Sequence, residues 1–138
     1  MLLIWTSALF LIPTWFAWRR NRRDIQYTCA LLTLTSLGYH SSYQFISETD
    51  RVLAMHNAFC YPIDVVVAHT TSFFYLTKNV IDNVRHPTKV GIISTGFGLI
   101  GLFIYYFKST CDNRLCFKWH GVVHGCAQLG YVVLTYGK

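Results

Sequence analysis

Apolar residues along this chain fall into five long blocks, separated by short stretches that carry charges or turn-forming residues. The blocks cover 2–18, 27–46, 52–77, 90–107 and 119–136. A helix that crosses the hydrocarbon core of a bilayer needs about 20 residues, within a range of about 17–25, and all five blocks lie close to that range. Lipid offers no partner to an unpaired backbone group, so helices are the expected spanning elements. The pattern predicts an all-α, polytopic membrane bundle of five transmembrane helices, forming one domain over 1–138.

Composition supports this prediction, because charged residues make up 13% of the chain and hydrophobic residues 53%. Soluble domains carry about 25% charged residues, so this chain has too little polar surface to cover itself in water. Two other interpretations exist. In the first, block 2–18 is a signal peptide, but it lacks a basic start and a small-residue cleavage site. In the second, the blocks are buried helices of a soluble bundle, but five in succession leave almost no amphipathic helix for its surface.

Basic residues are divided unequally between the two predicted sides of the membrane. The side with the first and third loops and the C-terminus carries eight Lys and Arg residues, and the other side carries four. Lys and Arg gather in cytoplasmic loops, so we expect the N-terminus outside or in the lumen and the C-terminus in the cytosol. The expected location is an endomembrane or the plasma membrane, with the mitochondrial inner membrane as the alternative. The net charge of +6 suits an anionic leaflet, and flanking clusters of this kind predict no nucleic-acid partner.

Polar side chains inside these blocks are costly in lipid and mark functional candidates. They are Ser36, His40, His56, Asp64, His69, His120 and His124. His40 lies about 10 Å below the membrane surface, counted at 1.5 Å per residue from the loop that follows it. His120 and His124 open the last block at the same surface, so they reach a similar depth. Ser36 lies one helical turn deeper than His40 and on the same face.

The depth of Asp64 depends on Pro62. If the helix runs unbroken from Arg51, Asp64 lies near the middle of the membrane. If Pro62 occupies the first turn of a helix, where proline is tolerated, Asp64 lies nearer the surface. Either placement keeps the carboxyl group in the half of the membrane that contains the three histidines.

The spacing His120-x-x-x-His124 places two imidazoles on one helical face, an arrangement that binds a metal with two ligands from one helix. His40 supplies a third imidazole from another helix, and three protein ligands with one open position are typical of catalytic zinc. Zinc lowers the pKa of bound water to about 7, and Asp64 is placed to hold and deprotonate that water. Ser36 is placed to donate a hydrogen bond to a substrate oxyanion.

Other intramembrane histidines and cysteines have simpler interpretations. His56 and His69 lack such a partner pattern, and we expect them to form structural hydrogen bonds between helices, as intramembrane His and Ser often do. Three cysteines within the blocks are interpreted as small packing residues: Cys29, Cys60 and Cys126. Cys111 and Cys116 share one short loop on the lumenal side, where an oxidising compartment permits a disulfide.

The order of these residues resembles the CREST superfamily of intramembrane hydrolases, which includes alkaline ceramidases, adiponectin and progestin receptors, GPI-lipid remodelling hydrolases and myomaker-like proteins. Its pattern is Ser-x-x-x-His on the second helix, Asp on the third and His-x-x-x-His on the last. Here these positions are Ser36, His40, Asp64, His120 and His124. The resemblance implies that the three histidines bind zinc, that Asp64 assists the zinc-bound water, and that Ser36 supports the oxyanion or the site.

The chain departs from that family in length. The family has a seven-helix core with three helices between the Asp and the final histidine pair, whereas 55 residues separate Asp64 from His120 and leave room for one. Loss of two adjacent antiparallel helices preserves the sidedness of the elements that follow. The wall of a lipid cavity would then be incomplete unless another chain closes it. A degenerate member with a structural role and a partial product are the other interpretations.

Two functions are therefore expected from different classes. The first is a zinc-dependent intramembrane lipid hydrolase, which cleaves an ester or amide bond of a phospholipid, a GPI lipid or a ceramide. The second is a small non-catalytic subunit of a larger membrane assembly, such as an organellar respiratory complex, whose partners are other membrane subunits. A haem-binding variant of the second would pair His40 with His69 or His120, and it leaves the spacing of His120 and His124 unexplained.

Overall fold

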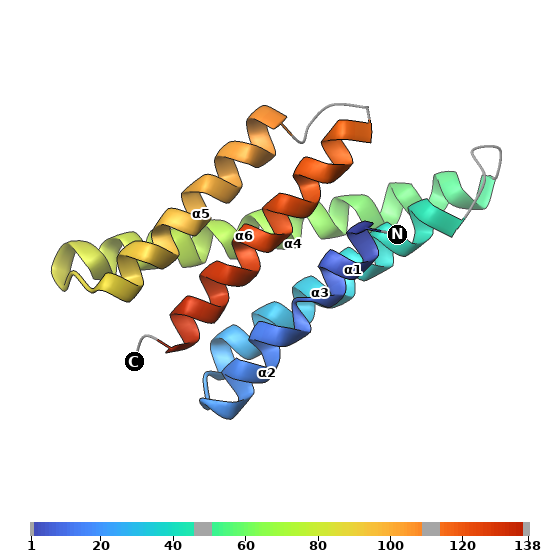
Figure 1. The fold of residues 1–138 in the computed structure, drawn as a ribbon. Coiled ribbons are helices and arrows are strands. Elements are labelled where there is room, and N and C mark those ends of the chain that lie inside the picture. Colours follow the sequence, from blue (N-terminus) through green and yellow to red (C-terminus); the bar gives the residue numbers. More distant parts are fainter. Residues whose placement is uncertain (1, 46–50, 109–113, 137–138) are drawn as a thin grey trace.

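The computed structural model describes residues 2–45, 51–108 and 114–136, and these residues form helices and no strand (Figure 1). In chain order the helices are α1 (Leu2–Ala8), α2 (Leu11–Arg19), α3 (Arg23–Phe45), α4 (Arg51–Arg85), α5 (Lys89–Lys108) and α6 (Arg114–Tyr136). The all-α class predicted from the sequence is confirmed for this part of the chain. Cys111 and the side chains of Cys116 and His56 lie outside the described residues.

The first apolar block forms two helices instead of one, and Pro13 explains the break between them. In a continuous helix the Leu9 carbonyl would accept a hydrogen bond from residue 13, but proline has no backbone N–H. The Leu9 carbonyl instead accepts from the Ile12 N–H at 3.0 Å, and the Phe10 N–H donates to the Ser7 carbonyl at 3.2 Å. These tighter bonds between residues three apart end α1 before α2 begins.

Pro62 has no such effect on α4, which runs unbroken from Arg51 to Arg85 with the proline inside it. Of the two placements considered for Asp64, the continuous helix is therefore the observed one. The 35 residues of α4 correspond to a length of about 52 Å at 1.5 Å per residue. The helix thus extends well beyond the apolar block 52–77.

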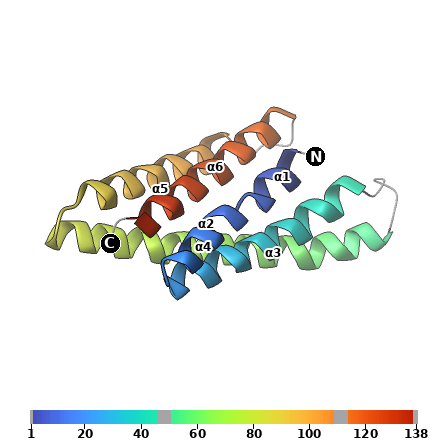
Figure 2. The same ribbon diagram turned by 60° about the horizontal axis from the view of Figure 1, so that its bottom comes forward.

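Helices that follow one another in the chain pack side by side, and α6 returns to lie against α1 and α2 (Figures 1 and 2). The most extensive contact joins α5 to α6. Gly101 permits this contact, because a Cβ atom added there would lie only 3.3 Å from Cβ of Cys126. The helices form a closed ring in the order α1/α2, α3, α4, α5 and α6, so the first and last segments complete the wall around a central cavity.

A turn between α2 and α3 brings Arg22 to one end of this ring. Asn21 adopts a positive φ of 56°, which asparagine tolerates better than most residues. The Arg22 N–H then donates to the Ala17 carbonyl at 2.8 Å and the Asn21 N–H to the Trp18 carbonyl at 3.1 Å. These two bonds form a Schellman motif, which satisfies the last carbonyls of α2.

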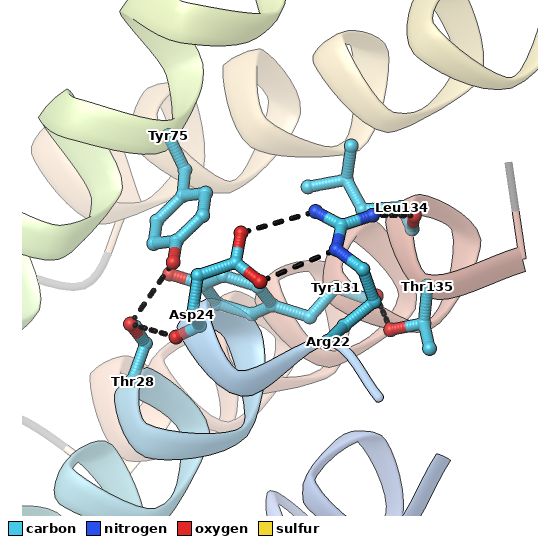
Figure 3. A network of polar contacts seen from close by, with 7 residues as sticks. All are labelled: Arg22, Asp24, Thr28, Tyr75, Tyr131, Leu134 and Thr135. Carbon is cyan, nitrogen blue, oxygen red and sulfur yellow. Dashed lines mark hydrogen bonds and ion pairs between the residues drawn. The ribbon is translucent and has the colours of Figure 1, made fainter. Parts of the chain in front are cut away.

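The side chain of Arg22 is the centre of a polar network at this end, the Arg22 cluster, formed by Arg22, Asp24, Thr28, Tyr75 and Leu134 (Figure 3). Its guanidinium donates to both carboxylate oxygens of Asp24, at 3.2 and 3.1 Å, and to the Leu134 carbonyl at 3.4 Å. The Thr28 hydroxyl donates to the Asp24 carbonyl at 2.9 Å and lies 3.1 Å from the Tyr75 hydroxyl. The network therefore joins α3, α4 and α6.

Apolar side chains cover much of the outside of the ring, while polar side chains lie within it. Phe59 and Phe73 are 72% and 73% exposed. Nine buried polar or charged residues stand beside eight buried hydrophobic ones among the described residues. By length and composition, one described helix, α5, is apolar enough to cross a membrane, with a mean hydropathy of 1.8 in its most apolar window.

Candidate metal centre

Three imidazoles meet at the end of the ring opposite the Arg22 cluster. His120 and His124 lie one turn apart on α6, with ring centroids 4.9 Å apart. His40 on α3 faces them across the helix interface, with centroid distances of 5.3 Å to His120 and 5.4 Å to His124. One nitrogen from each ring lies within 4.8 Å of the others, so the group can hold a metal ion. We call these three residues the histidine cluster.

Burial makes this cluster a costly arrangement without a ligand. His40 is 3% exposed and His124 is 7% exposed. Nε2 of His40 is buried and has no hydrogen-bond partner. A buried nitrogen of this kind loses its hydrogen bonds to water, which costs about 1–3 kcal/mol. A metal ion would use the lone pair of a neutral imidazole, and the donor set of three imidazoles fits a first-row metal such as zinc.

Thr6 on α1 contacts the cluster although the sequence did not indicate it. Its hydroxyl oxygen lies 3.2 Å from Nδ1 of His124, and the Phe10 ring packs edge-on against the same imidazole at a centroid distance of 5.7 Å. Thr6 and His124 are 118 positions apart, so no local spacing pattern relates them. The packing of α1 against α6 alone brings them together.

Asp64 and Ser36 form a buried pair on the two neighbouring helices α3 and α4. The Ser36 hydroxyl donates to Oδ1 of Asp64 at 2.7 Å, and the two residues are 3% and 6% exposed. Asp64 therefore has a hydrogen-bond donor in an otherwise apolar interior. Because the hydroxyl hydrogen of Ser36 is directed at Asp64, Ser36 holds this carboxyl group in place rather than pointing a free donor into the cavity.

A central cavity of about 150 Å³ connects these two groups. Ser36, Asp64, His120 and His124 all contribute to its wall. Along α6 its lining extends from His120 to Leu134, which is about 21 Å at 1.5 Å per residue. Most of the lining is apolar or aromatic, so the polar groups are concentrated at defined places.

A short chain of hydrogen bonds lies in the wall of the cavity. The side-chain amide of Asn79 on α4 donates to the hydroxyl oxygen of Ser94 on α5 at 3.2 Å. The Ser94 hydroxyl donates in turn to the Gly130 carbonyl on α6 at 3.1 Å. These bonds link α4, α5 and α6.

His69 lines the same cavity but does not join the histidine cluster. Its Nδ1 lies 2.8 Å from the Val65 carbonyl of the preceding turn, and its ring packs against Tyr105 at a centroid distance of 5.0 Å. The hydrogen bond lies within α4 and not between helices as expected, and the ring contact with Tyr105 joins α4 to α5. The haem variant that pairs His69 with His40 has no support in these contacts.

No protein-family model, curated protein or solved structure matches the chain. The resemblance to the CREST superfamily thus depends on the motif residues alone. The structure brings His40, His120 and His124 into one cluster that can hold a metal ion. The carboxyl–hydroxyl pair of Asp64 and Ser36 lines the same largely apolar cavity as His120 and His124.

Proposed function

We propose that the chain is a five-span membrane protein whose histidine cluster binds zinc and whose cavity binds a lipid for hydrolysis of an ester or amide bond. The observation that carries the proposal is the convergence of three imidazoles with a carboxyl–hydroxyl pair on a largely apolar cavity. Phospholipids, GPI lipids and ceramides are the substrate classes, since each has an ester or amide bond next to long hydrocarbon chains.

The exposed apolar surface supports membrane insertion of all the helices, with α1 and α2 counted as one segment. Large apolar side chains are exposed on every helix, including Trp5, Leu34, Phe73, Phe103 and Leu129. In water such a surface would cause association or aggregation, whereas in lipid it requires no cover. The α1–α2 pair, α3, α4, α5 and α6 then form the five spans.

The orientation proposed from the basic residues places the N-terminus outside or in the lumen and the C-terminus in the cytosol. The histidine cluster would then lie in the half of the membrane remote from the cytosol, and the Arg22 cluster at the cytosolic surface. A glycosylation acceptor fused to each terminus tests this arrangement. Modification at the C-terminus alone would reverse it.

The three imidazoles would hold zinc, and bound zinc supplies a Lewis acid that lowers the pKa of water to about 7. Asp64 would accept the proton that the attacking water loses. Ser36 holds the carboxyl group of Asp64 in place through the 2.7 Å hydrogen bond. The apolar wall would hold the hydrocarbon chain of the substrate and exclude bulk water, which strengthens electrostatic interactions at the site.

We further propose that the chain is a shortened relative of the CREST superfamily. Where that family has two further helices, α4 packs directly against α5. The ring of described helices is thus closed without them, and α3, α4, α5 and α6 all contribute to the lining of the cavity. This arrangement supports a site whose lining residues all come from one chain.

The test compares wild-type protein with Asp64→Asn in a zinc measurement and in a turnover assay with phospholipid, GPI lipid and ceramide. We expect Asp64→Asn to retain zinc and to lose hydrolysis by at least about 100-fold, because general-base catalysis contributes about 10²–10⁴-fold. Asp24→Asn is the matched control, since its carboxyl group lies in the Arg22 cluster outside the cavity, and it should retain turnover.

Wild-type protein without zinc would contradict the metal site. Wild-type protein that is loaded with zinc but inert toward all three lipid classes would favour the non-catalytic membrane subunit. In that case Asp64→Asn should leave the free energy of unfolding nearly unchanged or raise it slightly, because it removes a buried carboxyl group.

A further inference from the structure

The contact between Thr6 and His124 bears on which nitrogen of His124 carries hydrogen. The Thr6 hydroxyl oxygen lies 3.1 Å from the Leu3 carbonyl, which can only accept, and 3.2 Å from Nδ1 of His124. A hydroxyl has one hydrogen and two acceptor lone pairs. When that hydrogen is donated to Leu3, which also accepts from the Ser7 hydroxyl at 2.7 Å, the hydrogen between Thr6 and His124 comes from the imidazole. In this arrangement His124 is the Nδ1–H tautomer, and its lone pair lies on Nε2.

This tautomer suits a metal ligand. Protein imidazoles that bind metals usually donate the N–H of their other nitrogen to an oxygen nearby, which fixes the ring orientation and raises the basicity of the ligand nitrogen. Here that oxygen belongs to Thr6, and it holds the ring of a residue that is only 7% exposed. No other oxygen contact is needed to direct Nε2 of His124 away from α1.

Gln128 fixes Thr6 in turn. It lies one turn beyond His124 on α6 and is 9% exposed, and its side-chain amide donates to the Thr6 carbonyl. Thr6 is thereby held to α6 through its side chain at His124 and through its backbone at Gln128. α1 itself packs against both α3 and α6.

We propose that Thr6 is a positioning residue of the metal centre, which fixes His124 as the Nδ1–H tautomer and presents Nε2 to the metal, with Gln128 holding Thr6 in place. This role rests on the proposed metal site but needs no hydrolytic activity. The N-terminal segment then contributes to the metal centre although it supplies none of its ligands.

The first measurement is zinc affinity, determined by competition with a chromophoric chelator in detergent micelles. Thr6→Val keeps the shape of the side chain and removes its oxygen, and we expect affinity to fall about 10–100-fold, as for loss of other such partners. Thr6→Ser restores the oxygen and should recover most of that loss. Gln128→Met should weaken binding less, because it leaves the Thr6 hydroxyl in place.

Thr14→Val is the matched control. The Thr14 hydroxyl donates to the Phe10 carbonyl at 2.8 Å, so this variant also loses a threonine side-chain bond to a backbone carbonyl of the first apolar block. It has no contact with the histidine cluster and should bind zinc like wild type. Equal losses in Thr6→Val and Thr14→Val would overturn the positioning role, since both would then reflect helix stability.

The second measurement needs no metal. The ¹⁵N chemical shifts of imidazole nitrogens distinguish the two neutral tautomers, and His124 in metal-free wild type should show the Nδ1–H form. Thr6→Val should shift it toward a mixture, while Thr6→Ser should not. An Nε2–H form of His124 in wild type, or zinc affinity and tautomer unchanged in Thr6→Val, would overturn the proposal. Failure of wild type to bind zinc would refute the proposed function, while the tautomer of metal-free protein would still test Thr6.

Discussion

The Arg22 cluster and the histidine cluster lie at opposite ends of one ring of helices, and they differ in whether their polar atoms have hydrogen-bond partners. In the Arg22 cluster the guanidinium meets both oxygens of Asp24 and the Leu134 carbonyl, and Thr28 connects α3 to Tyr75 on α4. In the histidine cluster the rings touch one another, yet Nε2 of His40 has no partner. One cluster is complete with the chain's own atoms, and the other has an unused ligand atom.

Natural proteins pair nearly all of their buried polar groups, so each exception requires an explanation. The Arg22 cluster shows that this fold can satisfy a charged group at a helix end. Among the described residues, Oε1 of Gln26 and the Tyr131 hydroxyl are also buried without a partner, so the feature that sets Nε2 of His40 apart is the pair of further imidazoles beside it. The comparison supports the proposal that one end of the ring contributes stability and the other binds a metal ion.

Removal of a ligand from the histidine cluster should have the largest effect. His124→Ala leaves two imidazoles, and we expect it to lose most of the bound zinc, with affinity at least about 100-fold lower, since loss of an outer partner alone costs 10–100-fold. Elemental analysis of purified protein measures the effect. His69→Ala removes an imidazole from the same cavity outside the cluster and should retain zinc. Undiminished zinc in His124→Ala would contradict the assignment of the ligands.

Disruption of the Arg22 cluster should affect stability instead. Arg22→Met removes the contacts to Asp24 and Leu134, and hydrogen bonds to charged groups contribute about 1.5–3 kcal/mol. Because exposed ion pairs contribute less, we expect the free energy of unfolding to fall by about 1 kcal/mol. Zinc affinity should not change. Arg23→Met, whose guanidinium makes a single 3.4 Å contact with Asn21, is the control, and an equal loss there would show that charge alone matters.

The unpaired nitrogen of His40 predicts the opposite change in stability. His40→Phe replaces the imidazole by a ring without polar atoms, so the metal-free protein should gain about 1 kcal/mol in free energy of unfolding, while zinc binding is lost. Denaturation in detergent without metal measures this gain. A less stable His40→Phe protein would mean that Nε2 has a partner in the folded state.

The smallest effect concerns pH. The hydrogen bond from Arg22 lowers the pKa of Asp24 from its usual value of 3.8. A carboxyl group with a depressed pKa in the folded state stabilises the protein above about pH 4, and this contribution disappears as pH falls through the folded pKa. Wild type should therefore lose more stability below pH 4 than Asp24→Asn does. The difference should be small, because 43% of the Asp24 side chain is exposed, and identical pH profiles would contradict it.

Much of the architecture was predictable from the pattern of apolar blocks, because each of the last four blocks corresponds to one helix. The helix ends were not predictable, since hydropathy detects only the apolar part of a helix. α4 continues through polar residues as far as Arg85, and these residues give no hydropathy signal. The break after α1 had a visible cause in Pro13, but the block length concealed it.

The histidine cluster was predictable because the level of a residue in a helical bundle follows from a count of residues. His40 lies near the end of α3, and His120 and His124 lie near the start of α6, so antiparallel packing of the two helices brings them to a similar level. Thr6 was not predictable in this way. Its contact depends on the packing of α1 against α6, which has no local signal in the sequence.

A metal ion in the histidine cluster would also connect two distant parts of the chain. His40 and His120 are about 80 residues apart, so a metal shared between them closes a long loop, and long loops lose the most entropy on closure. A bound ion would act as a reversible cross-link between the N-terminal half and the α5–α6 hairpin, comparable to a disulfide but controlled by metal supply. Its removal would free the hairpin to separate from α1 and α3 first, since those contacts are less extensive than the contact between α5 and α6.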